Sequence, residues 1–160
     1  MLQSFDYIVD SESRILIVGT MPGEASLSAG QYYAHPRNVF WNIIADVFNN
    51  GRELADYDVK KNCLLTHGVG LWDSLKYCER PGSLDSDIRN EHPNDFNGLL
   101  QMHPQIRLLL FNGQKAFSFF KKYHAPLLQT INYQVLPSTS PANARLNYQQ
   151  KLELWKQALK

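Results

Sequence analysis

Aromatic and amide side chains gather in one stretch of the sequence and could together form a pocket for a flat heterocycle. Aromatic rings stack on the faces of a nucleic-acid base, while a primary amide offers a donor and an acceptor to its edge. The predicted pocket consists of Tyr32, Tyr33, Asn38, Phe40, Trp41 and, from a later part of the chain, Asn112. Phe40 and Trp41 are explained as core residues of a helix, and we assign them to the core. Tyr33 lies in a loop just before His35 and Pro36, so it remains a candidate for stacking on a base.

Several familiar catalytic signatures are absent from the sequence. The segment from Gly19 to Gly23 is neither a GxGxxG fingerprint nor a phosphate-binding loop, because no Gly-Lys-Ser/Thr follows it. No serine lies in a GxSxG motif, the usual frame of a hydrolase triad. The five histidines show no metal-ligand spacing, and Cys63 and Cys78 are too few for a zinc site. We therefore predict no metal and no cofactor, and we interpret the cysteines as buried thiols.

Apolar strands are expected to bring the candidate residues to a common edge. The predicted strands cover residues 15–18, 69–75, 106–111 and 133–136. Three of them end at unusual residues, namely Gly19, Asn112 and Pro137. Because parallel strands point their carboxyl ends the same way, these residues should lie on one side of a sheet, where open α/β sheets bind ligands.

Helical spacing of apolar residues predicts helices between the strands. The predicted helices cover residues 40–48, 58–67, 95–102, 114–122 and 148–159, with Asp95 as the cap of the third. The segment 78–94 has no periodicity, and we interpret it as an ordered loop. The polar run that follows Gly23 is predicted to be loop as well. Alternating strands and helices predict a three-layer α/β/α fold with a four-stranded, mostly parallel sheet.

Length and composition suit one globular domain. With 160 residues, of which 44% are hydrophobic and 19% charged, the chain can build a single core, so we predict one domain over residues 1–160. No run approaches the roughly 18 apolar residues of a membrane span, and the first ten residues lack the features of a secretory signal. We expect a soluble, cytoplasmic monomer. The net charge of +1 does not indicate a nucleic-acid binder, so such a role must depend on a local patch.

Four motifs, in their order along the chain, resemble those of the uracil-DNA glycosylase superfamily. They are Gly19-Thr20-Met21-Pro22-Gly23, Tyr33-Ala34-His35-Pro36-Arg37-Asn38-Val39-Phe40-Trp41, Gly70-Leu71-Trp72-Asp73 and Leu136-Pro137-Ser138-Thr139-Ser140-Pro141. The chain is similar to the mismatch-specific and hypoxanthine-DNA glycosylase branches, and Gln31-Tyr32-Tyr33 with the run from Gly82 to Ile88 favours the latter. The resemblance covers about residues 14–145. It implies a monofunctional enzyme that flips a deaminated base out of DNA and hydrolyses its N-glycosidic bond.

The resemblance also implies roles for individual residues. Tyr33 would stack on the base and Asn112 would read its edge, in a pocket lined by Gly19, Thr20, Met21, Pro22 and Gly23. A later loop would enter the minor groove and grip phosphates, and it consists of Pro137, Ser138, Thr139, Ser140, Pro141, Ala142 and Asn143. Positive charge around the site would come from Arg37, Lys115 and Arg145, for which solvated surface charge is the simpler explanation. The predicted partner is DNA that contains deaminated or mismatched bases.

One position departs from the family pattern. Many members carry Asp or Asn directly before the motif proline, where it activates or positions water, whereas this chain has Met21, whose thioether can do neither. Asn38 corresponds to a polar residue of the hypoxanthine branch, so we predict that it positions the attacking water or steadies the departing base. The structural alternative is that Asn38 only bonds backbone amides at the start of a helix.

Two functions remain open at this point. The first is a DNA-repair glycosylase for hypoxanthine, with uracil, xanthine or mismatched bases as further candidates. The second is a catalytically inactive α/β module that binds nucleotides or damaged DNA, which the loss of a carboxylate at Met21 keeps open. Ranking the bases requires the orientation of the amides and the depth of the pocket.

Overall fold

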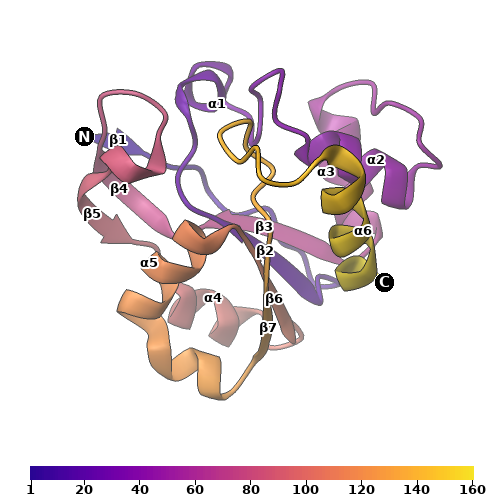
Figure 1. Cartoon of the computed structure of the whole chain (residues 1–160). Helices are drawn as coiled ribbons and strands as arrows, with labels where there is room; N and C mark the ends of the chain where they lie inside the picture. Colours follow the sequence, from indigo (N-terminus) through magenta and orange to yellow (C-terminus); the bar gives the residue numbers. More distant parts are fainter.

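A four-stranded parallel sheet forms the centre of the computed structural model, which describes residues 1–160 (Figure 1). Its strands are β2 (Ile15–Gly19), β3 (Val69–Asp73), β6 (Leu108–Asn112) and β7 (Asn132–Leu136). They pair in the order β3-β2-β6-β7, and every pairing is parallel. The predicted sheet is therefore confirmed, although β6 begins at Leu108 because the amide of Ile106 bonds to His103 in a turn.

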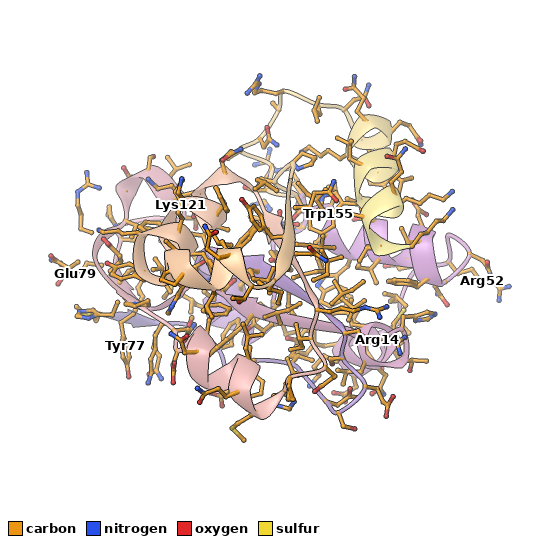
Figure 2. All side chains as sticks on the ribbon, turned by 90° about the horizontal axis from the view of Figure 1, so that it is seen from below. Arg14, Arg52, Tyr77, Glu79, Lys121 and Trp155 are labelled. Carbon is orange, nitrogen blue, oxygen red and sulfur yellow. The ribbon has the colours of Figure 1, made fainter.

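Helices cover both faces of this sheet and complete the predicted three layers. One face carries α2 (Phe40–Phe48), α3 (Tyr57–Thr66) and α6 (Tyr148–Leu159), and the other carries α4 (Phe96–Met102) and α5 (Gln114–His124). On the first face, Phe40 and Trp155 are fully buried in one core cluster. Figure 2 shows the side chain of Trp155 on the inner side of α6. On the second face, Phe96 and Phe120 belong to a separate cluster.

The side chains of β2 alternate between the two faces of the sheet, and this explains why its sequence is continuously apolar. Ile17 points into the cluster beneath α2 and α6, whereas Leu16 and Val18 point into the cluster beneath α4 and α5. All three side chains are fully buried. A strand that is covered on both faces needs an apolar side chain at every position, and this is the pattern that made the strand predictable.

A second, antiparallel sheet is the main correction to the prediction. Residues 78–94, predicted as a loop, contain the end of β4 (Leu75–Glu79), the 3-10 turn η1 (Asp85–Asp87) and β5 (Arg89–Pro93). Strand β4 pairs with β5 and with β1 (Leu2–Gln3). The pairing of β4 with β5 shifts register, and of this region only Leu75, Cys78 and Ile88 are buried in a small cluster. So few buried positions leave no periodic pattern in the sequence.

The polar run after Gly23 is the second correction, because it forms the six-residue helix α1 (Glu24–Ala29) rather than a loop. Only Ser26 is buried, so α1 has no apolar stripe that could have predicted it. It ends at Gly30, whose φ of 67° lies in the left-handed region.

The remaining helices follow the prediction. Asp95 caps α4, since its side chain accepts a hydrogen bond of 2.9 Å from the amide of Gly98. A 3-10 segment, η2 (Ala125–Gln129), follows α5. None of the helices combines the length and hydrophobicity needed to cross a membrane.

The carboxyl ends of the parallel strands meet at one edge of the sheet, as predicted. The loop after β7 runs back along this edge and approaches the side on which α1 lies (Figure 1). Segments that are far apart in the sequence are therefore brought together around the ends of β2, β3 and β6.

Candidate functional site

A cavity of about 660 Å³ opens at the carboxyl edge of the parallel sheet. This volume lies in the range of pockets that hold small ligands. Among the predicted site residues, the cavity is lined by Gly19, Thr20, Met21, Pro22, Gly23, Tyr33, Arg37, Asn38, Asn112, Ser138, Thr139, Ser140, Pro141, Ala142 and Asn143. Pro137, Lys115 and Arg145 lie outside this lining. The structure thus brings most of the predicted residues around one cavity.

Gly19 allows two polar side chains to approach the end of β2. A Cβ atom at this position would lie 2.3 Å from Oδ1 of Asp73 and 2.7 Å from the hydroxyl of Tyr33. Both distances are far shorter than any normal contact of a Cβ atom. Glycine is therefore required here because of the space that its neighbours occupy, and the two polar groups converge on one point of the cavity wall.

Tyr33 adopts a conformation that is unusual for a residue with a side chain. Its φ of 54° lies in the left-handed region, which costs free energy and is often found at functional sites. Its ring stacks on Phe40 with centroids 4.2 Å apart, and its hydroxyl is buried without a hydrogen-bond partner. Burial raises the pKa of Tyr33 well above its ordinary value, and the Asp73 carboxyl adds to this shift, whereas the nearby Asn112 amide opposes it. The hydroxyl therefore stays protonated.

Asp73 is a site residue to which the sequence prediction gave no role. It ends β3, lines the cavity and is only 3% exposed. Its Oδ2 atom is buried without a hydrogen-bond partner. Burial raises the pKa of Asp73 to about 8, and Asp85 adds to the shift whereas Arg80 opposes it. The available signal was an acidic residue at the end of an otherwise apolar strand, which alone does not distinguish a site residue from an ordinary strand end.

The backbone around Asp73 is fixed by a dense set of hydrogen bonds. The side chain of Asn94 donates to the carbonyl oxygens of Asp73 at 2.8 Å and Leu75 at 3.1 Å. Ser74 donates its amide to Gly19 at 2.7 Å and its hydroxyl to Ala116 at 2.8 Å. These bonds join β3 to β2, β5 and α5, so the Asp73 side chain projects from a rigid position.

The segment between β4 and β5 closes one side of the cavity. Arg80 is 8% exposed and donates to the carbonyl oxygens of Pro22, at 2.7 Å, and Gly82. Ser83 accepts a hydrogen bond of 2.9 Å from the amide of Glu24, at the start of α1. Asp85 also lines the cavity, and burial raises its pKa. The run from Gly82 to Ile88 belongs to the family resemblance, but its place in the cavity wall was not predicted.

Met21 belongs to the protein interior as much as to the cavity. It is 7% exposed and packs in the small cluster that contains Leu75, Cys78, Ile88 and Phe119. An apolar side chain at this position therefore stabilises the contact between the first loop and the antiparallel sheet.

Asn38 lines the cavity, and its side chain also makes the contact with a backbone amide that is the structural alternative to a catalytic role. Its Oδ1 atom accepts a hydrogen bond of 2.9 Å from the amide of Phe40, the first residue of α2. This contact fixes the orientation of the carboxamide. It leaves the amide nitrogen free to bind a ligand, and Oδ1 retains a second lone pair.

Asn112 joins the end of β6 to the loop after β7. Its Nδ2 donates to Oγ1 of Thr139 at 3.0 Å, and its Oδ1 accepts from the amide of Thr139 at 2.9 Å. The carbonyl oxygen of Thr139 in turn accepts from the amide of Val39 at 3.1 Å. Asn112 therefore holds this loop in place, and the two bonds to Thr139 use one donor and one acceptor position of its amide.

The remainder of the loop after β7 is shaped by its own hydroxyl groups. Ser138 and Ser140 accept hydrogen bonds of 3.2 Å from the amides of Ser140 and Ala142. Lys151 of α6 donates to the carbonyl oxygen of Asn143 at 2.7 Å. The serine hydroxyl hydrogens are thus available to an acceptor such as a phosphate.

The cavity as a whole combines aromatic rings, the three carboxamides of Asn38, Asn112 and Asn143, and hydroxyl groups. It also holds the carboxyl groups of Asp73 and Asp85, whose pKa values burial raises. No group of three or more His, Cys, Asp or Glu side chains is arranged to hold a metal ion. Its lining includes no lysine. Such a site can bind a polar heterocycle and exchange hydrogen bonds and protons with it.

The family model of the uracil DNA glycosylase superfamily matches residues 5–160 of the chain. A protein of Methanosarcina acetivorans named hypoxanthine DNA glycosylase is 37% identical over 153 residues, which cover 94% of each chain. A protein of the same name from Methanosarcina barkeri is 33% identical over 160 residues, or 99% of this chain and 98% of that one. A G/U mismatch-specific uracil DNA glycosylase of Schizosaccharomyces pombe is 30% identical over 66% of this chain and 33% of its own.

A solved structure agrees with these sequence matches. The solution NMR structure of a candidate uracil DNA glycosylase from Methanosarcina acetivorans superposes with a TM-score of 0.81. It is 37% identical to this chain, and the alignment covers 98% of this chain and 95% of that one.

The close approach at Gly19 leads to a prediction about stability. Gly19→Ala should lower the free energy of unfolding by about 1–3 kcal/mol, because its methyl group overlaps the buried Asp73 and Tyr33 side chains. Gly82→Ala is the matched control, since nothing lies within 4 Å of a Cβ atom there, and it should change stability by less than about 0.5 kcal/mol. Urea denaturation measures both. Equal stability of the two variants would show that the ends of β2 and β3 do not meet as described.

Proposed function

This chain belongs to the uracil DNA glycosylase superfamily, and on that premise we propose that it is a monofunctional DNA-repair glycosylase that removes hypoxanthine from DNA. The observation that carries the proposal is the cavity at the sheet edge, in which Tyr33, Asn38 and Asn112 offer a ring and two carboxamides to a base. The choice of hypoxanthine is supported by the names of the two relatives that match the chain over nearly its whole length.

Base flipping is the first step of the proposed reaction. The target nucleotide leaves the helix at a cost of a few kcal/mol, which is smallest for a mispaired base such as deaminated adenine. We propose that the base enters the cavity, stacks on Tyr33 and bonds to the Asn112 amide. The loop from Pro137 to Asn143 enters the minor groove, and the Ser138 and Ser140 hydroxyls bind phosphates. In support of this, the hydrogen atoms of both hydroxyls are free of bonds to the loop itself.

Hydrolysis then requires little activation of the water. When the glycosidic bond breaks early, a sugar cation forms, and DNA phosphates and backbone dipoles stabilise it. Positioning of the water supplies much of the remaining acceleration. We assign this positioning to Asn38, whose carboxamide is held by the amide of Phe40 while its nitrogen remains free. The absence of lysine from the cavity lining supports a reaction without a Schiff base.

We further propose that residues 1–160 act as one domain and as a monomer on DNA. The loop after β7, the first motif and Arg37 all line one cavity, so a single copy of the chain holds a complete set of proposed contacts. Lys115 and Arg145 are proposed to bind phosphates beyond the rim of the cavity.

A panel of lesion substrates tests the proposed activity. With protein in excess over duplexes that carry a single deoxyinosine, deoxyuridine, deoxyxanthosine or G/T mismatch, we expect abasic sites to form fastest at deoxyinosine. Alkali converts them to strand breaks that gel electrophoresis quantifies. If no duplex yields abasic sites, the enzyme assignment is wrong and the binding-module alternative takes its place.

The role of Asn38 can be separated from its contact with α2. Asn38→Ala should lower the single-turnover rate on deoxyinosine by roughly 10²- to 10³-fold, the usual effect of losing one positioned polar group. Asn38→Ser is the matched variant, because a serine oxygen can still accept from the amide of Phe40. It should retain the stability of the parent protein but be as slow as Asn38→Ala. A serine variant that cleaves like the parent would assign Asn38 to helix capping alone.

Salt dependence tests the proposed phosphate contacts. The logarithm of the DNA-binding constant should fall linearly with the logarithm of salt concentration, with a slope of about −0.9 per phosphate contact. Arg37→Ala and Arg145→Ala should each reduce the steepness of this slope by about 1. Arg52→Ala is the control, because Arg52 does not line the cavity and follows the carboxyl end of α2, whereas Asn38 precedes the other end. Figure 2 shows Arg52 at the edge of the molecule. If an arginine variant keeps the slope of the parent protein, the replaced side chain does not contact a phosphate.

A further inference from the structure

We propose that Asp73 is the general acid of the reaction and delivers a proton to N7 of the hypoxanthine ring as its glycosidic bond breaks. This inference rests on the function proposed above and assigns the departing base a proton donor. It begins from a residue that lines the cavity and whose carboxyl group is buried, with its Oδ2 atom left without a partner.

The position of Asp73 is difficult to explain by structure alone. The residue is 3% exposed, lines the cavity and ends a strand whose other side chains are all buried. Its Oδ2 receives no hydrogen bond, and the ion pairs of the protein, Lys61 with Asp58 and Lys122 with Glu91, do not involve it. A buried carboxylate without a partner is strongly destabilising. Such a group is retained more readily where it has a chemical role.

The surroundings of Asp73 keep it in the acid form near neutral pH. Burial raises its pKa to about 8, and the negative charge of Asp85 on η1 acts in the same direction. Arg80, which follows β4, opposes the shift. Its Nε and Nη2 atoms donate to Gly82 and Pro22, its Nη1 atom is buried without a partner, and it forms no ion pair with Asp73. The other ionisable groups that interact with Asp73 are the phenols of Tyr33, Tyr32 and Tyr57, and their raised pKa values leave them neutral. Asp73 is therefore a proton donor rather than a carboxylate.

Other groups of the cavity are less suited to this role. The Tyr33 hydroxyl converges with Asp73 on Gly19, but its raised pKa makes it a weak acid. His35 is an exposed residue of the rim. Asn38 and Asn112 carry no proton that can be transferred at neutral pH. Asp73 is thus the buried group whose acidity suits a transfer near pH 7 to 8.

The proposed step balances in atoms and charge. The bond between C1′ and N9 breaks, its electron pair stays on the purine, and the Asp73 proton moves to N7. The base leaves as the neutral tautomer of hypoxanthine that carries hydrogen on N7. Water adds to C1′ as hydroxide, and its proton returns to the Asp73 carboxylate through solvent. Transfer to N7 is favoured over transfer to O6, because only the N7 product is an ordinary neutral tautomer.

The test is the pH dependence of kcat/KM on a deoxyinosine duplex, which reports ionisations of the free enzyme. For the parent protein, kcat/KM should fall as pH rises through about 8, the pKa of Asp73. Asp73→Asn keeps the shape of the side chain but has no acidic proton. It should lower kcat/KM by roughly 10²- to 10⁴-fold and should abolish the decline at high pH. Circular dichroism verifies that the variant is folded.

Asp85→Asn is the matched control, since it removes the neighbouring carboxyl but leaves Asp73 in place. Loss of the Asp85 charge lowers the pKa of Asp73, so the decline in kcat/KM should move to lower pH and remain visible. A decline that stays at the same pH in Asp85→Asn would mean that the titrating group is not beside Asp85, and would overturn the assignment.

The experiments distinguish a failure of this inference from a failure of the proposed function. If the parent cleaves deoxyinosine and Asp73→Asn either keeps the parental rate or slows the reaction without removing the high-pH decline, this inference is wrong and the proposed function stands. If the parent cleaves no lesion, the proposed function fails and the inference fails with it. Carbon-13 NMR of the Asp73 carboxyl gives a measurement that needs no substrate and no variant. Titration near the ordinary aspartate value of about 4 would overturn the inference.

Discussion

The close approach of the β2 and β3 ends is the constraint on which the site depends. Ser74 donates its amide to Gly19 at 2.7 Å, and the absence of a side chain at Gly19 lets Asp73 and Tyr33 reach the same point. This contact is possible only because the two strands are parallel and in register from Ile15 with Val69 to Gly19 with Asp73. The chemistry of the cavity is therefore fixed by the same pairing that forms the core. A loop-borne carboxyl would lack this rigidity.

The other walls of the cavity are secured by side-chain bonds that each join two distant segments. Asn112 ties the end of β6 to Thr139, Arg80 ties the antiparallel sheet to Pro22, and Asn94 ties β5 to the end of β3. Two of these three side chains are amides that bond backbone or hydroxyl groups. They hold loops that would otherwise lose much conformational entropy on binding DNA. We infer that a large part of the polar sequence near the cavity serves preorganisation rather than contact with a ligand.

The sequence predicted the parallel sheet because burial on both faces demands continuous apolar runs, as in Ile15–Val18. It failed for β4, β5 and α1, which bury few side chains and therefore have no periodic pattern. The extent to which the site residues could be predicted also depends on whether the sequence alone carries a signal for them. The placement of Tyr33 and Asn38 at the cavity could be predicted from their residue types and from family motifs, whereas nothing in the sequence distinguishes Asp73 from the rest of its motif. The role proposed for Asp73 rests on burial, a missing partner and the proximity of Asp85, which are properties of the folded chain.

A neutral acid in the cavity suits a protein that must approach a highly charged polymer. DNA carries one negative charge per about 1.7 Å of helix axis, and a carboxylate directed at the flipped nucleotide would repel the flanking phosphates. Met21 at the first motif and a protonated Asp73 both avoid this repulsion. The same phosphates favour the proton on Asp73 further when DNA binds, since nearby negative charge raises the pKa of a carboxyl. Binding of DNA would then prepare the acid for transfer.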